Sequence, residues 1–154
     1  MQRRRILGLA PALLAVAACG ATPEAPGGAT GTAAPGSPEH FMQSAGDRVF
    51  FELDSWTLTP VARETLTRQA AWLKQYGERY PVVTIEGHAD ERGTREYNIA
   101  LGERRAAAAR DFLAAGGVAR GKLRIVSFGK ERPEIVGNDE GSWSRNRRAV
   151  TTLR

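Results

Sequence analysis

The chain has 154 residues, of which 42% are hydrophobic and 25% are charged, and its formal net charge is +5. This length and composition indicate one globular domain with attached segments and exclude a wholly disordered chain. Arg3, Arg4 and Arg5 supply most of the excess charge, because removal of residues 1–18 leaves 19 basic against 17 acidic residues. With only 7% aromatic residues to stack on bases, the chain is not expected to bind nucleic acid.

The first 18 residues have the organisation of a bacterial signal peptide. A basic start at residues 1–5 is followed by an apolar stretch at residues 6–16 and by the small residues Ala17 and Ala18. The apolar stretch is shorter than the ~20 residues that a transmembrane helix requires. Cys19 follows directly and is the one cysteine of the chain, so no intramolecular disulfide is possible. An ordinary secretory signal with a chance cysteine and a buried free thiol are the alternatives.

Residues 16–20, Val-Ala-Ala-Cys-Gly, resemble the lipobox of bacterial lipoproteins. The resemblance implies that Cys19 carries acyl chains such as palmitate and becomes the first residue of the mature protein. Several chains form a durable anchor, because each buried methylene contributes ~0.8 kcal/mol. Gly20 stands where such lipoproteins carry an aspartate when they stay at the inner membrane. We therefore expect a lipid anchor in the outer membrane and a domain that faces the periplasm.

Residues 20–46 are dominated by Gly, Ala, Pro, Thr and Ser, with almost no large apolar side chain before Phe41. Such a composition cannot offset the entropy of ordering, so it predicts a flexible linker with an r.m.s. reach of ~30 Å. The predicted organisation is a signal peptide over residues 1–18, a lipidated N-terminus and linker over residues 19–46, and one folded domain over residues 47–154.

The folded part alternates between the two hydrophobic periodicities. Period-two and β-branched runs predict strands, whereas apolar residues at helical spacing, with Thr59-Pro60 and Gly116-Gly117 as boundaries, predict helices. Strands are expected over residues 49–53, 82–86, 123–128 and 148–153, and helices over residues 60–76 and 95–115. Residues 129–145 are expected to be irregular. The order βαβαββ predicts an α/β (α+β) fold, a mixed sheet with the helices packed on one face.

Several charged residues are predicted to meet at one edge of this fold. Arg105 falls within ~40° of the apolar face of its helix, so it must find an anionic partner or reach a cleft. Asp54 and Asp90 follow the first two strands, and Asn98 flanks the same helical stripe. Two acids and an arginine together would bind a zwitterion, the ammonium at the carboxylates and the carboxylate at the guanidinium. A purely structural Asp–Arg pair is the alternative.

The residues give no sign of an enzyme, a metal site or a cofactor. No activated nucleophile is evident, and the two histidines, His40 and His88, are too far apart in sequence to indicate zinc. A wall-cleaving hydrolase remains the alternative, with Asp90 and Glu91 or Asp54 as acid and base.

The remaining arginines and tryptophans leave two alternatives open. Arg145, Arg147 and Arg148 are either contacts to wall phosphates or a partner, or a solvated strand end. Trp56 and Trp72 are expected to be partly buried in the core rather than to form a ligand-binding box.

Three ordered motifs resemble one protein family. They are His88-Ala89-Asp90-Glu91-Arg92-Gly93-Thr94 with the helix that follows it, Val126-Ser127-Phe128-Gly129-Lys130-Glu131, and Asn146-Arg147-Arg148-Ala149-Val150. Together they resemble the peptidoglycan-associated lipoproteins, a group within the OmpA C-terminal domain family. The resemblance covers residues 47–154, although residues 55–80 match loosely.

The resemblance implies a site for meso-diaminopimelate in the stem peptides of peptidoglycan, formed by Asp90 and Arg105. It extends ligand contact to Asp54, His88, Ala89, Asn98 and Leu101. Leu53 stands where the family commonly has an aromatic residue.

The resemblance also implies TolB as a partner, membership of the Tol-Pal envelope system, and a part in envelope integrity and in outer-membrane constriction during cell division. A porin or a flagellar stator subunit of the same family is the alternative, but each needs a membrane barrel or helix that is not expected after Cys19.

Overall fold

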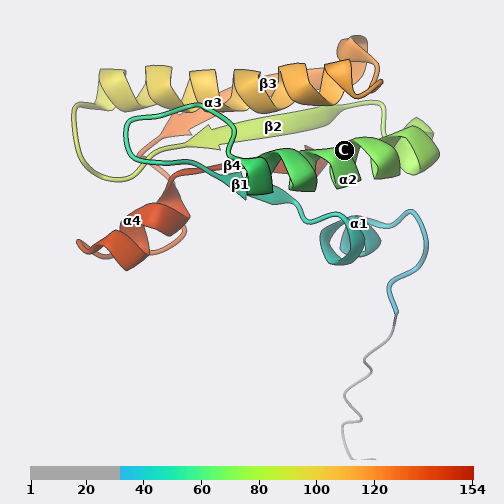
Figure 1. The fold of residues 1–154 in the computed structure, drawn as a ribbon, viewed down its shortest axis with the longest axis horizontal. Helices are drawn as coiled ribbons and strands as arrows, with labels where there is room; N and C mark the ends of the chain where they lie inside the picture. Colours follow the sequence, from blue (N-terminus) through green and yellow to red (C-terminus); the bar gives the residue numbers. More distant parts are fainter. Residues whose placement is uncertain (1–31) are drawn as a thin grey trace, which may run out of the picture. The chain divides into compact units, whose positions relative to one another are not determined.

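The computed structural model describes residues 32–154, so the predicted signal peptide, Cys19 and residues 20–31 of the predicted linker lie outside it. Four strands form one mixed sheet in the order β1-β4-β2-β3 (Figure 1). The strands are β1 (Arg48–Phe50), β2 (Val83–His88), β3 (Leu123–Gly129) and β4 (Arg148–Leu153). β2 and β3 run parallel, and β4 runs antiparallel to both β1 and β2. The predicted mixed sheet is confirmed.

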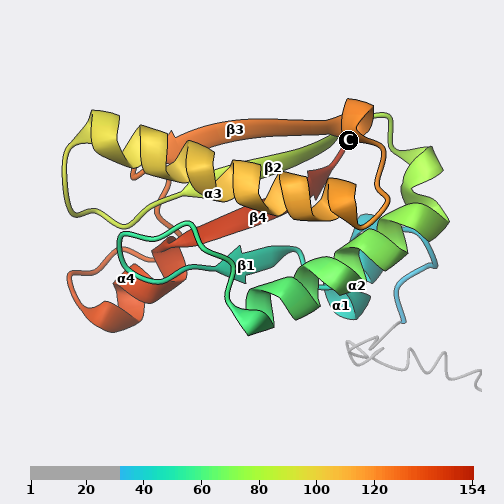
Figure 2. The same ribbon diagram turned by 45° about the horizontal axis from the view of Figure 1, so that its top comes forward.

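Two long helices lie on the same face of the sheet (Figures 1 and 2). They are α2 (Pro60–Tyr76) and α3 (Arg95–Ala115), and short 3-10 turns follow them at Gly77–Arg79 and Arg120–Lys122. The core between helices and sheet holds fully buried side chains such as Leu66, Ile85 and Leu113. None of the helices in residues 32–154 is long and apolar enough to cross a membrane.

The segment predicted to be irregular contains one further helix, α4 (Glu140–Asn146). Asp139 caps it, because its carboxylate accepts a hydrogen bond of 2.8 Å from the backbone N–H of Ser142. The expectation that all of residues 129–145 lack secondary structure was therefore wrong. Seven residues are too few for a recognisable hydrophobic period, so α4 left little signal beyond its cap.

Two glycines allow α3 to lie directly against β2. A Cβ atom on Gly87 would stand 1.8 Å from the carbonyl oxygen of Gly102 on the helix, so any side chain there would push the helix away. The hydroxyl of Ser127 on β3 then donates a 2.7 Å hydrogen bond to the carbonyl of Ile99. This close approach brings Arg105, one helical turn after Gly102, to the end of β2.

The N-terminal part of the packed unit is a short helix, α1 (Pro38–Ser44), inside the predicted linker. Phe41 on this helix is 1% exposed and packs edge-on against Trp72 of α2, with 4.9 Å between the ring centroids. The indole N–H of Trp72 also donates a 2.9 Å hydrogen bond to Nδ1 of His40. Helix α1 therefore packs against the domain, although it precedes the predicted boundary at residue 47.

We predict that Phe41→Ala lowers the free energy of unfolding by about 3 kcal/mol, because it empties a buried aromatic site. Met42 is the matched control, since it lies on the same helix but is 54% exposed. Met42→Ala should change the stability by about 0.5 kcal/mol or less. Urea unfolding of the two variants measures both values, and equal losses would contradict the packing of α1 as part of the domain.

Candidate functional site

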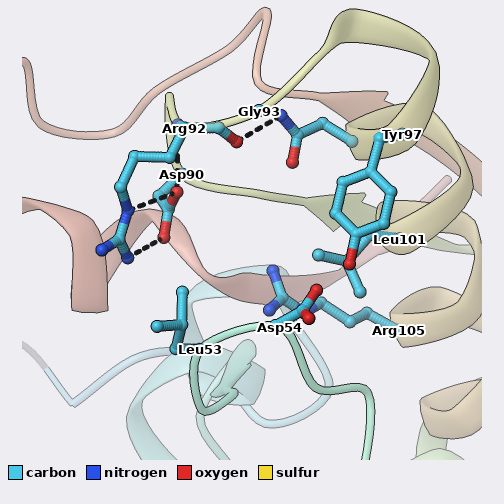
Figure 3. A pocket seen from close by; sticks show the side chains of 9 residues that line it. Leu53, Asp54, Asp90, Arg92, Gly93, Tyr97, Leu101 and Arg105 are labelled. Atoms are coloured by element: carbon cyan, nitrogen blue, oxygen red, sulfur yellow. Dashed lines mark hydrogen bonds and ion pairs between the residues drawn. The ribbon is translucent and has the colours of Figure 1, made fainter.

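A pocket of about 350 Å³ lies where the loops after β1 and β2 face the N-terminal half of α3 (Figure 3). The residues that line it are Leu53, Asp54, Asp90, Arg92, Gly93, Tyr97, Asn98, Leu101 and Arg105. The predicted site residues Asp54, Asp90, Asn98, Leu101 and Arg105 are therefore brought together. A larger cavity of about 440 Å³ lies beside β1, but none of the predicted site residues lines it.

Arg105 holds the two loops together from beneath the pocket. Its Nη1 donates a 2.9 Å hydrogen bond to the carbonyl of His88, at the end of β2. Its Nε and Nη2 donate to the carbonyls of Ser55 and Glu52, at 2.8 and 3.1 Å, in the loop after β1. Removing this side chain would leave carbonyls in both loops without their partner.

Arg105 is more deeply buried than the sequence indicates, where an accessible guanidinium is expected to bind the ligand's carboxylate. The residue is 0% exposed, so its guanidinium forms the floor of the pocket rather than an open fork. Burial and the nearby charge of Arg147 lower the pKa of Arg105 to about 10, while Asp90 and Asp54 act in the opposite direction. The group therefore stays charged at neutral pH and contributes a positive potential under the pocket. The direct ion pair between Arg105 and Asp90, which the sequence left open as the alternative, is not formed, because the guanidinium donates to backbone carbonyls.

The carboxylate of Asp90 is held by two other arginines. Arg92 donates hydrogen bonds of 2.7 and 3.2 Å to its two oxygens, as the dashed lines in Figure 3 show. Arg147, the residue between α4 and β4, has Nη1 3.4 Å from one of these oxygens. Burial alone would raise the pKa of Asp90, but the hydrogen bonds and charge of Arg92, helped by Arg147, lower it below its usual value. Asp90 is therefore an anion at neutral pH.

The loop after β2 is fixed by contacts to its neighbours on both sides. Buried Asn98 donates a 2.8 Å hydrogen bond from its amide to the carbonyl of Arg92. The ammonium of Lys130 donates to the carbonyls of Glu91 and Gly93, at 3.2 and 2.6 Å. These contacts hold the charged groups of the pocket in place before any ligand arrives.

Asp54 is the acid of the pocket that solvent reaches. It is exposed, and its φ of 53° makes it the one non-glycine residue with a positive φ among residues 32–154. Such strained backbone is typical of functional loops, and aspartate tolerates it better than most residues do. The turn directs the carboxylate of Asp54 over the buried guanidinium of Arg105 (Figure 3).

His88 and Ala89 lie beside the pocket and do not line it. Gly87 faces α3, so the next side chain, that of His88, points to the helix-free face of the sheet, where it packs 5.5 Å from the ring of Phe128. Both ring nitrogens of His88 are buried without a hydrogen-bond partner in the described structure. Its backbone carbonyl accepts the hydrogen bond from Arg105. Ligand contact by the side chains of His88 and Ala89 stays a prediction.

The backbone of Ala89 helps to hold in place the loop that lines the pocket. Its N–H donates a 2.8 Å hydrogen bond to the carbonyl of Gly129, which ties the loop after β2 to the end of β3. In this way His88 and Ala89 support the site through backbone groups. The sequence motif could not separate this role from side-chain contact, since both require the same residues at the same positions.

Two of the three C-terminal arginines are internal, and the expectation of a solvated strand end was wrong for them. Arg147 is 4% exposed and donates a 3.0 Å hydrogen bond from Nε to the carbonyl of Phe51, while its other nitrogens pair with Asp90 and Glu140. Arg148 is 7% exposed and lies 3.1 Å from a carboxylate oxygen of Glu134. Arg147 therefore belongs to the support of the pocket.

Sequence reasoning missed Arg92 and Tyr97 as lining residues. The side chain of Arg92 is 36% exposed, and its guanidinium lies 3.9 Å from the ring centroid of Trp143 on α4. Trp143 in turn donates a 3.1 Å hydrogen bond to Glu91. Tyr97 could have been predicted from its position in the sequence, because it precedes Leu101 by one helical turn and so lies on the same face of α3.

Comparison with known proteins assigns the family. Residues 50–147 match the OmpA family. The peptidoglycan-associated lipoprotein of Mesorhizobium japonicum is 54% identical, with 92% of this chain and 87% of that protein covered. The chain belongs to the OmpA family. The peptidoglycan-associated lipoprotein of Brucella melitensis is 51% identical over 91% of this chain and 86% of that protein.

Two solved structures have a similar fold. The crystal structure of the peptidoglycan-associated lipoprotein from Burkholderia pseudomallei is 38% identical, with a TM-score of 0.70, and covers 77% of this chain and 100% of that chain. The C-terminal domain of Helicobacter pylori MotB has a TM-score of 0.65 at 19% identity, with 70% of this chain and 84% of that chain covered. The second likeness concerns the fold alone.

We predict that His88 makes the domain less stable in mild acid. Burial, together with the charges of Arg148 and Arg132, lowers the pKa of His88 from 6.5 to about 4. Between these values the unfolded chain binds a proton that the folded chain does not, so stability falls as the pH falls through this window and levels off below it. From about pH 7 to about pH 4.5 this loss amounts to roughly 2 kcal/mol.

Urea unfolding at the two pH values, for the natural protein and His88→Gln, measures this contribution. Glutamine does not titrate, so the variant should lose less stability on acidification by about the same roughly 2 kcal/mol. All other titrating groups cancel in the comparison. An equal acid loss in both proteins would contradict a neutral, buried His88.

Proposed function

We propose that the protein binds the diaminopimelate-containing stem peptides of peptidoglycan without covalent attachment and so holds the outer membrane to the cell wall. The observation that carries this proposal is the pocket in which Asp54 and Asp90 stand beside Arg92 and above Arg105. The names of the relatives, peptidoglycan-associated lipoproteins, point to the same material.

The chemistry of meso-diaminopimelate suits this arrangement of charges. The free end of its side chain carries an ammonium and a carboxylate on one carbon atom. Asp54, which solvent reaches, and Asp90 would take the ammonium. The half-exposed guanidinium of Arg92 and the buried charge of Arg105 would favour the carboxylate. A ligand with one of these charges missing would leave part of the pocket uncompensated.

The same electrostatics argue against a hydrolase that uses Asp90 as its acid. A general acid must hold its proton near neutral pH, which requires a raised pKa. The pKa of Asp90 is lowered, because Arg92 and Arg147 stabilise the carboxylate against its burial. Asp90 is therefore unsuited to that role, and together with the likeness to peptidoglycan-associated lipoproteins this supports binding without bond cleavage.

The other end of the protein would be anchored in the outer membrane through acyl chains on Cys19, with the domain in the periplasm. The sequence at residues 16–20 supports this anchor. The resemblance to peptidoglycan-associated lipoproteins supports TolB as a partner and a place in the Tol-Pal system. In that system the protein would serve envelope integrity and outer-membrane constriction during division.

We predict that Asp90→Asn largely abolishes cosedimentation of the domain with purified diaminopimelate-containing sacculi. The amide keeps the shape but removes the negative charge that would hold the ligand's ammonium. The matched control is Asp111→Asn, because Asp111 is also paired with two arginines but lies far along α3 and does not line the pocket. Sedimentation and circular dichroism together separate lost binding from lost folding.

The control should sediment like the natural protein. Sacculi with lysine at the diaminopimelate position should bind the natural domain weakly, because lysine lacks the second carboxylate. Full retention of Asp90→Asn on diaminopimelate sacculi would contradict the assignment of the pocket.

For the anchor, we predict that Cys19→Ser prevents incorporation of a radiolabelled or clickable fatty acid and releases the protein from the membrane fraction. Serine lacks the thiol that would receive the first acyl chain. Fatty-acid labelling of the variant at the level of the natural protein would rule out Cys19 as the lipidated residue.

A further inference from the structure

Trp56, in the loop between β1 and α2, is an exposed tryptophan beside the pocket. It is 45% exposed, whereas Trp72 is 5% exposed in the core, so the expectation of a core position was wrong for Trp56. The preceding residue, Ser55, is fixed by its 2.8 Å hydrogen bond from Arg105. The guanidinium of Arg104 lies 4.9 Å from the centroid of the Trp56 ring. The indole is thus presented to solvent from a loop that Arg105 pins in place.

Trp56 and Arg104 continue the pocket along α3. Asp54, two residues before Trp56, lines the pocket from the same loop. On the helix, Leu101 lines the pocket, and Arg104 follows it at a spacing of three, which places both on one face. Figure 1 shows the loop between β1 and α2 lying against this part of α3.

The guanidinium of Arg104 contacts the Trp56 ring, but its N–H donors are left without an acceptor among residues 32–154. Arg104 is exposed and has no hydrogen-bond or ion-pair partner within residues 32–154, although a guanidinium carries five N–H donors. Other surface arginines near the site are paired, as Arg92 is with Asp90 and Arg95 with Glu131. An ordered aromatic surface next to an unused guanidinium is a common form of recognition site.

We propose that Trp56 and Arg104 form a second subsite, which takes an amino sugar of the glycan strand. This inference rests on the proposed function, because the stem peptide is attached to the glycan at the end opposite to diaminopimelate. A pyranose ring presents a face of C–H groups that packs on an indole. Its acetamido and hydroxyl oxygens are acceptors for the guanidinium of Arg104. The pocket would then select the peptide tip, and this subsite would add contact with the sugar.

Calorimetric titration of the domain with two ligands tests the subsite. One ligand is the free tripeptide L-Ala-γ-D-Glu-meso-diaminopimelate, and the other is the same tripeptide carrying the disaccharide. The natural domain should bind the disaccharide form more tightly by roughly 3- to 10-fold. Trp56→Ala should erase this difference and leave the affinity for the free tripeptide unchanged. In an NMR spectrum, the indole N–H of Trp56 should shift with the disaccharide form and not with the free tripeptide.

Phe50→Ala is the matched control, because Phe50 is also 45% exposed but lies on β1 beside the larger cavity, and this variant should keep the full preference for the sugar. If Trp56→Ala lowers the affinity for both ligands equally, the glycan subsite is overturned, because Trp56 would then contact the peptide or stabilise the loop. Equal binding of both ligands by the natural domain would overturn it as well, while the proposed function would stand. If neither ligand binds the natural domain, the subsite and the proposed function both fail.

Discussion

The guanidinium of Arg105 lies inside the protein and donates hydrogen bonds to three backbone carbonyls, two in the loop after β1 and one at the end of β2. A buried charge is costly unless its donors are satisfied, and here the acceptors belong to the two loops that form the pocket. The loops and the charge therefore stabilise one another. The same charge lies beneath the carboxylate of Asp54 and near that of Asp90, which keeps two acids close together without strong repulsion. The candidate binding site is thus a consequence of how one arginine is satisfied.

Close packing of helix and sheet makes this arrangement possible. Gly87 and Gly102 allow α3 to approach β2 so closely that the side chain of Arg105 reaches the carbonyl of His88. A side chain at either glycine would displace the helix, and with it the donor that joins the loops. Buried Arg147 and partly exposed Arg92 both pair with Asp90, so that this carboxylate is also held in place by ion pairs. The pocket is organised before it meets a ligand, which lowers the entropic cost of binding.

The main strands and both long helices could be predicted from the sequence, because their periodicity and capping residues agree with their tertiary environment. The convergence of Asp90 and Arg105 could also be predicted, since a strand end and one helical face determine it. Asp54 was expected at the end of a strand over residues 49–53, but β1 ends at Phe50 and the loop after it brings Asp54 to the pocket. The burial of Arg105 could not, because its partners are backbone carbonyls that no residue type reveals. Nor could the orientation of His88, which depends on strand alternation next to a register shift between β2 and β3. α1 was missed because Phe41 is the one buried residue of this helix, within a segment whose average composition indicates a linker.

A crystal structure of the domain with the tripeptide L-Ala-γ-D-Glu-meso-diaminopimelate is the decisive test of the proposed binding site. We expect the ammonium of the diaminopimelate tip within about 3 Å of the carboxylates of Asp54 or Asp90. We expect its carboxylate on the side of Arg92, above Arg105, with the three carbonyl contacts of Arg105 unchanged. A tripeptide bound in the larger cavity beside β1, or bound in the pocket with its charged tip directed into solvent, would contradict the account.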